Sequence, residues 1–197
     1  EEAVAVLDEV QQQKKESGTT YYGEATELLD TTQAAQLSGQ IFLEATGADA
    51  ALISYNIYQP EVLSNLENGY GANGQILPGK MSEEDITIFL PTGWYDTLQT
   101  ATLTGNQIKQ MAKDGCDLRD NGYPYPYVLM TKDGSALEDE NEYTVVICGI
   151  PKAMKESRSL NLQDTGIVGL DAAKEYLTKV GELSSATLDD YLVQIVE

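Results

Sequence analysis

A helix that passes directly into a buried strand constrains this sequence more than any other feature. Within Ala34–Tyr55, apolar residues recur first at helical spacing, so one face of that segment packs in a core: Ala34, Leu37, Ile41, Phe42 and Ala45. Gly47 follows where a left-handed cap is needed, a conformation that glycine adopts without a Cβ clash. The apolar run up to Tyr55 is too short for another helix and predicts a strand. A helix joined to a strand in this way is typical of α/β-type units, whose strand ends often carry sites.

Capping signals and apolar stripes predict the helices. Thr104 with Gln107, and Ser82 with Asp85, have the spacing of a capping box, while Gly115 and Gly181 stand where helices should end. We expect four main helices and one short helix: Glu2–Lys15, Asp30–Thr46, Gly105–Asp114, Leu170–Val180 and the short Glu83–Phe89.

Stretches rich in β-branched and aromatic residues predict the strands. We expect strands at Thr19–Thr26, Thr97–Leu103 and Leu188–Val196, and a strand pair turning around Asp133-Gly134: Tyr127–Thr131 with Tyr143–Cys148. Together these elements predict an α+β fold with a mixed sheet in a single domain.

Composition excludes several classes of function. The chain has no histidine, which excludes Ser-His-Asp and Cys-His catalysis and any His-ligated metal centre. Its net charge of −20 and its two arginines, Arg119 and Arg158, argue against nucleic acid and anionic membranes as partners. Cys116 and Cys148 cannot form a zinc site by themselves; we favour two free thiols over a disulfide between them.

Two loops carry unusual numbers of aromatic residues. The long stretch Asn56–Lys80 contains glycines and asparagines together with Tyr58 and Tyr70, and it either covers a site or simply connects elements. Gly122–Tyr127 alternates proline and tyrosine, which stiffens the loop. It is either an aromatic platform for a flat ligand or a rigid turn whose rings pack on the domain, and from the residues alone we favour the turn.

The order of motifs resembles the C-terminal domain of the 5'-nucleotidase family. Five segments are similar to that domain's motifs, in the same order: Thr46–Leu52 (TGADiAl), Leu77–Leu98 (pG.it..D....lPfgNtL), Leu103–Lys109 (LTGaqlke), Asp133–Val145 (nGkpl…YtVa) and Asp164–Leu177 (dTG…a…Yl). The resemblance covers about Tyr22 to Leu192. It divides the chain into a linker helix at 1–18 and the domain at 19–197.

In that family an N-terminal metallophosphoesterase domain holds two metals, and the C-terminal domain supplies the substrate pocket. The resemblance therefore implies no catalytic residue, metal or cofactor in this chain, and divalent metals only in a preceding catalytic domain of the same polypeptide. It also implies an extracellular or cell-surface location. We accordingly expect the isolated chain to have no phosphatase or nucleotidase activity, since it lacks histidine and any recognisable metal-ligand cluster.

The family's pocket loops are only partly matched here. The family has NGGGIR where this chain has Ser54–Gln59, so Gln59 replaces an arginine and cannot grip an anion bidentately. Thr92 stands for the phenylalanine of PFGN, and the family's GGDGY is missing after Val145. The expected substrate-binding residues come from three loops: Tyr55, Asn56, Tyr58, Gln59, Trp94, Tyr95, Tyr123 and Tyr125.

Two functions remain open on this basis. The chain is the nucleotide-binding domain of a secreted phosphoester hydrolase acting in nucleotide catabolism, or a diverged surface module that binds a partner or a neutral ligand and no longer binds nucleotides. We favour the first, because the linker-like helix implies a preceding domain.

Overall fold

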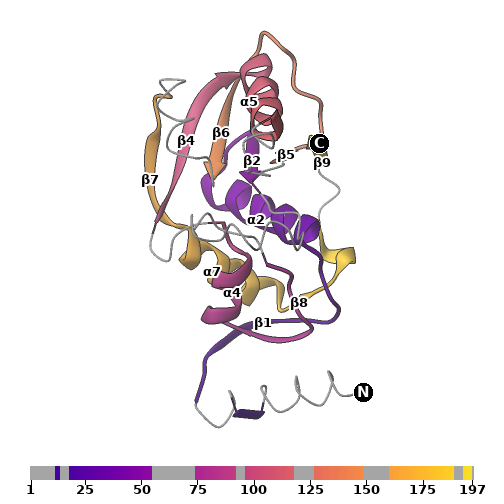
Figure 1. The fold of residues 1–197 in the computed structure, drawn as a ribbon. Coiled ribbons are helices and arrows are strands. Elements are labelled where there is room, and N and C mark those ends of the chain that lie inside the picture. The colour runs from indigo at the N-terminus through magenta and orange to yellow at the C-terminus, as the bar shows by residue number, and fades with distance from the viewer. Residues whose placement is uncertain are drawn as a thin grey trace.

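The computed structural model describes residues 12–13, 18–54, 74–91, 96–117, 127–148, 160–188 and 193–196. Figure 1 shows a large sheet, a long helix beneath it, and a second, smaller layer that holds two more helices. The helices are α2 (Thr31–Thr46), α4 (Glu83–Phe89), α5 (Gly105–Asp117), α7 (Gly169–Val180) and a 3-10 turn, η3 (Ser185–Thr187). The strands are β1 (Tyr21–Ala25), β2 (Ala50–Ser54), β3 (Gly79–Ser82), β4 (Thr97–Thr104), β5 (Tyr127–Thr131), β6 (Glu142–Cys148), β7 (Gln163–Val168), β8 (Glu182–Leu183) and β9 (Val193–Val196). The expected α+β fold is confirmed.

The large sheet has six strands in the order β7-β4-β6-β2-β5-β9. It is mixed, because β2 runs parallel to β6 and antiparallel to β5. The expected pairing of β5 with β6 is therefore wrong: β2 lies between them. Gly134 does turn the chain at positive φ, but residues 132–141 form a connection long enough to cross the buried strand. Because β2 is buried on both faces, its backbone N–H and C=O groups need a hydrogen-bonded strand at each edge, and β5 and β6 are those two strands.

Helix α2 lies at the centre of the molecule. Asp30 caps its amino end, because the Asp30 carboxylate accepts a hydrogen bond from the backbone N–H of Gln33 at 2.8 Å. In return, the side-chain oxygen of Gln33 accepts a hydrogen bond from the backbone N–H of Asp30 at 2.9 Å. Gly47 ends it at φ 68°. Between Ala34 and Leu43 every residue except Gln36 is buried, so the helix is covered by the sheet on one side and by α4 and α7 on the other. The sequence indicated only one buried face.

Contact between α2 and β5 is close enough to require glycine. A Cβ added to Gly39 would lie 2.5 Å from the sulfur of Met130 on β5 and 3.4 Å from Ile53 on β2. Two polar side chains are buried on this helix, and both are bonded: Ser38 donates to the Ala34 carbonyl, and Gln40 bonds the Tyr176 hydroxyl at 2.6 Å.

Helix α5 covers the opposite face of the sheet. Its apolar side chains Ile108, Met111 and Ala112 pack with alternate residues of the strands, including Leu52 and Val145. Thr104 and Gln107 form the expected reciprocal cap, with bonds of 2.9 and 3.2 Å. The helix does not end at Gly115, as expected, but continues to Asp117.

A second sheet, which the sequence did not indicate, has three strands in the order β3-β1-β8. Strand β1 pairs antiparallel with β3 and parallel with β8. Ser82, at the end of β3, starts α4 with the expected capping box. Lys174 of α7 ties the layer together, because its ammonium group lies 2.6 Å from the Glu83 carboxylate and above the Tyr22 ring.

Two expected elements lie partly outside the described residues. Of the helix expected at Glu2–Lys15, only Gln12 and Gln13 are described, and both are helical. Of the strand expected at Leu188–Val196, the described residues are Leu188, which follows the turn η3, and Val193–Val196, which form the strand β9. In the described part of the chain, no helix has the length and apolar character needed to cross a membrane.

Candidate functional site at the carboxyl end of the central strands

The strand register brings the ends of four strands together. Ser54, the last residue of β2, pairs with Tyr127, the first residue of β5. Ile53 pairs with Cys148, the last residue of β6, and the start of β4 lies beside the same end of β6, since Gln99 pairs with Ile147. One end of the sheet therefore presents the carboxyl ends of β2 and β6 and the amino ends of β4 and β5.

Each segment that carries expected site residues is attached to this end of the sheet. Tyr55–Gln59 follow Ser54, Trp94-Tyr95 precede β4, and Tyr123 and Tyr125 precede β5. The eight expected residues themselves lie outside the described residues, as do the two arginines: Tyr55, Asn56, Tyr58, Gln59, Trp94, Tyr95, Tyr123, Tyr125, Arg119 and Arg158. The chain topology thus anchors all three loops at one place, and the positions of their side chains remain a prediction.

A bulge in β7 fixes the strand that follows the Trp94-Tyr95 segment. The register between β4 and β7 shifts between Thr97 and Gln99. Asp164 accepts the Gly166 amide at 2.8 Å, where Gly166 has φ 72°, and Thr165 donates to the Leu98 carbonyl at 2.8 Å. The bond from the Gly166 amide, followed by one from the Thr97 side chain, holds the pKa of Asp164 below its ordinary value. The Asp164-Thr165-Gly166 motif therefore has a structural role, because it holds the start of β4 against β7 by hydrogen bonds.

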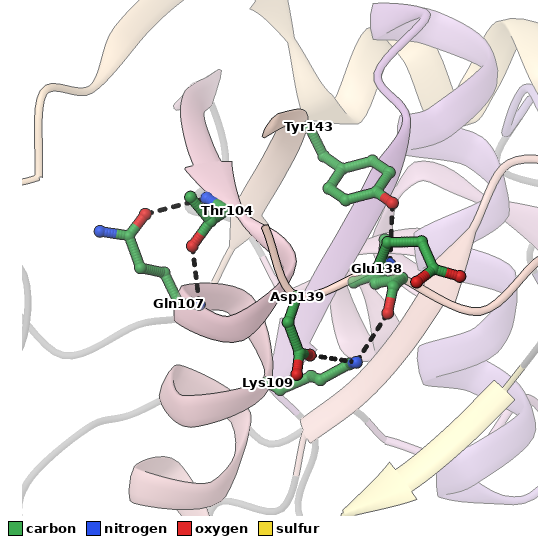
Figure 2. A network of polar contacts seen from close by, with 7 residues as sticks. Thr104, Gln107, Lys109, Glu138, Asp139 and Tyr143 are labelled. Atoms are coloured by element: carbon green, nitrogen blue, oxygen red, sulfur yellow. Dashed lines mark hydrogen bonds and ion pairs between the residues drawn. The ribbon is translucent and has the colours of Figure 1, made fainter. Parts of the chain in front are cut away.

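The opposite end of the sheet holds a polar network that joins α5 to the connection between β5 and β6. Lys109 donates to the Leu137 carbonyl at 2.6 Å and to the Asp139 carboxylate at 2.8 Å, and Figure 2 shows Lys109 and Asp139 in contact. Tyr143 accepts the Glu138 amide at 2.9 Å in the same view. These groups hold the connection between β5 and β6 against α5, and the strand register separates them from the carboxyl end of β2 by the length of the sheet.

Lysines of the described region are largely engaged in structural contacts. Lys109 is held by Asp139, Lys174 by Glu83, and Lys179 by Glu44 at 2.6 Å, while Lys80 lies over the Tyr21 ring. Among the described residues, no group of three or more His, Cys, Asp or Glu side chains is placed to hold a metal ion. These lysines therefore hold the scaffold of the described part of the domain together.

Sequence reasoning missed a cleft between α2 and α7. It has a volume of about 380 Å³ and lies against the end of β7, with Glu44, Asp171 and Glu175 at its rim. No local signal could have revealed it, since it forms between two helices that are far apart in the sequence.

Comparison with known proteins identifies the fold through structure alone. No family model and no curated protein matches the sequence. A 5'-nucleotidase precursor from Thermus thermophilus is 17% identical with a TM-score of 0.58, and the match covers 92% of this chain and 41% of that chain. This chain has the 5'-nucleotidase C-terminal type of fold. The resemblance inferred from the motifs is confirmed at the level of fold.

Two further solved structures have the same fold. NAD nucleotidase from Haemophilus influenzae is 14% identical with a TM-score of 0.61, over 96% of this chain and 40% of that chain. Sulfate thiohydrolase SoxB from Thermus thermophilus, solved with glycerol, is 16% identical with a TM-score of 0.53, over 92% of this chain and 36% of that chain. This chain spans less than half the length of each protein. Since the names of the three proteins denote different substrates, the fold by itself does not specify a ligand.

Proposed function

We propose that this chain is the non-catalytic substrate-binding domain of a secreted 5'-nucleotidase-like phosphoester hydrolase that acts in nucleotide catabolism. The observation that carries the proposal is the register of the central sheet. It attaches three aromatic-rich segments to a single end of the sheet, where open α/β sheets commonly bind ligands.

The lengths of the structural neighbours support the proposal that catalysis and substrate binding belong to separate domains. Each neighbour is a much longer chain, of which this fold occupies 36 to 41%. In this proposal, metals and the attacking water belong to an N-terminal metallophosphoesterase domain of the same polypeptide. The sequence has no histidine with which to replace that domain's metal ligands.

The side chains expected at this site determine which part of a nucleotide they bind. Tyr55, Tyr58, Trp94, Tyr95, Tyr123 and Tyr125 offer ring faces, on which a base stacks with about 1–3 kcal/mol per ring. Asn56 and Gln59 offer neutral amides, which bind base or sugar polar groups but do not neutralise phosphate. The domain therefore binds the nucleoside part, and the phosphate lies on the metal-bearing domain.

The proposal is tested with the longer polypeptide encoded by the same reading frame. We expect the sequence before Glu1 to contain the D-x-H, G-N-H-E and G-H-x-H motifs, and the longer protein to release phosphate from AMP with divalent metal. Replacing Tyr58 by alanine should raise KM roughly five- to a hundredfold, because the lost stacking is ground-state binding. Tyr21→Ala, a half-buried tyrosine in the small sheet, is the matched control and should leave KM unchanged.

In a second candidate function, the domain has the same fold but does not bind nucleotides. Gln59 in place of an arginine favours a diverged surface module that binds a neutral ligand or a partner. An upstream sequence without metal-ligand motifs, together with no binding of nucleosides, would select this second function over the first.

A further inference from the structure

The cleft between α2 and α7 is a half-open hollow in the part of the chain that the structure describes. Its volume is about 380 Å³, within the range of small-molecule sites. One wall comes from α2, the other from α7, and the end of β7 closes one side: Ile41, Glu44, Ala45, Ile167, Val168, Asp171, Ala172, Glu175 and Tyr176. None of these residues belongs to the loops of the proposed nucleoside site.

The floor of the cleft is apolar and partly open to water. Ala45 and Ala172 face it from the two helices, and Ile167 and Val168 from β7, each half-buried and packed against the main core. Ile41 and Tyr176 are buried beneath them, and the Tyr176 hydroxyl is bonded to Gln40. Two alanines facing each other leave the space that larger side chains would fill.

The rim carries carboxylates on both walls. Glu44, on α2, pairs with Lys179 at 2.6 Å, an exposed pair. Asp171, on α7, lies 3.5 Å from Lys174, whose shorter contact of 2.6 Å is with Glu83. Glu175 forms no hydrogen bond or ion pair with any described residue, and it is exposed. An apolar floor between acidic walls is complementary to a cation that has an apolar stem.

The dimensions of the cleft favour a small molecule over a docked helix as its ligand. The lining residues span Ile41–Ala45 on one helix and Asp171–Tyr176 on the other, about 6 and 8 Å at the helical rise per residue. A docked helix is about 10–12 Å across and would need a longer groove.

We propose that this cleft binds a small aliphatic diamine. One ammonium group lies at the Glu175 and Asp171 carboxylates, the other at Glu44 on the facing wall, and the methylene chain lies over Ala45 and Ala172. The ligand chemistry is independent of the proposed nucleoside site, so either can fail without the other.

Calorimetric titration of the full chain with diaminopentane tests this, at physiological ionic strength so that diffuse attraction to the acidic surface is screened. Saturable one-to-one binding is expected, with pentanediol and Mg²⁺ giving none, because the first lacks charge and the second lacks a stem. Glu175→Gln should weaken binding roughly fivefold, the upper range for a partly exposed ion pair. Ala172→Leu, which fills the floor without changing charge, should abolish binding.

The matched control removes two carboxylates elsewhere. Glu84 on α4 and Glu140 before β6 are exposed and outside the cleft, so Glu84→Gln/Glu140→Gln should bind diaminopentane within about twofold of the parent. Equal loss in the control and in Glu175→Gln would show diffuse attraction and overturn the proposal. No saturable binding, or binding only of a short lysine-containing peptide, would also overturn it. Folding of each variant is checked by its urea midpoint.

Discussion

Replacing Gly105 by alanine should destabilise the domain, although alanine is the better helix former. Gly105 opens α5 beneath the connection between β5 and β6. An added Cβ would lie 2.2 Å from the Glu138 carbonyl oxygen, 2.9 Å from its carbon and 3.2 Å from the Leu137 Cβ. The atoms in the way are mostly backbone, which cannot rotate aside as a flexible side chain would. The connection itself must therefore move.

The size of the effect follows from the bonds that hold this connection. The Gly105 amide donates to the Asn141 carbonyl at 3.0 Å, the Asn106 amide donates to the Asp139 carbonyl at 3.0 Å, and Lys109 donates to the Leu137 carbonyl at 2.6 Å. Each bond has a net value of about 1 kcal/mol, so losing two or three costs about 2–3 kcal/mol. Alanine returns at most about 1 kcal/mol of helix propensity. We expect a net loss of about 1–2 kcal/mol.

Urea unfolding followed by circular dichroism measures this loss. Asn106→Ala is the control, because it makes a neighbouring first-turn residue into alanine without placing a Cβ against the Glu138 backbone; its free energy of unfolding should change by less than about 0.5 kcal/mol. Equal or greater stability of Gly105→Ala would refute the reasoning, since helix propensity would then outweigh the steric contact.

Four further predictions concern titration, packing and activity. The hydrogen bond to Glu83 raises the pKa of Lys174, so its stabilisation is present below the ordinary lysine pKa of about 10.4 and lost as pH rises through the folded value; Lys174→Met should flatten that alkaline fall in urea midpoint. The lowered pKa of Asp164 has the opposite sign: its stabilisation is present above the ordinary pKa of about 3.9 and lost as pH falls through the folded value, and Asp164→Asn should flatten the acid limb. Gly39→Ala should cost about 1–3 kcal/mol by overpacking against Met130, and it should cost less when it is made in a Met130→Ala background, which lacks the sulfur that the new Cβ meets. The isolated chain should release no phosphate from AMP with or without divalent metal, and metal-dependent release by pure chain would contradict this.

Local signals in the sequence predicted the helices well because helix ends depend on neighbouring residues. Ser82, Thr104 and Gly181 each act within a turn of their position, and the structure confirms all three. The expected helix end at Gly115 was wrong. A glycine inside a helix destabilises it by only about 1 kcal/mol, and the packing of α5 on the sheet outweighs this loss.

Strand pairing was less predictable because partners are chosen by tertiary packing. The insertion of β2 between β5 and β6 pairs residues that are 73 to 81 positions apart on one side and 95 apart on the other, and no local pattern distinguishes it from a hairpin. Strands β3 and β8 are too short to give a periodic signal. For the candidate site, the motifs predict three loops, whose residues lie outside the described part of the chain and whose role stays a prediction. The cleft at Ala45 and Ala172 arises only when α2 and α7 meet.

The central claim is tested most directly by titrating the chain with adenosine and with AMP while following the fluorescence of Trp94, its only tryptophan. An aromatic site without arginine predicts weak, saturable quenching by both, with similar affinities and little dependence on salt, because the rings bind the nucleoside part. AMP binding far more tightly than adenosine would contradict the aromatic-only site. No response to either compound would contradict nucleoside binding altogether.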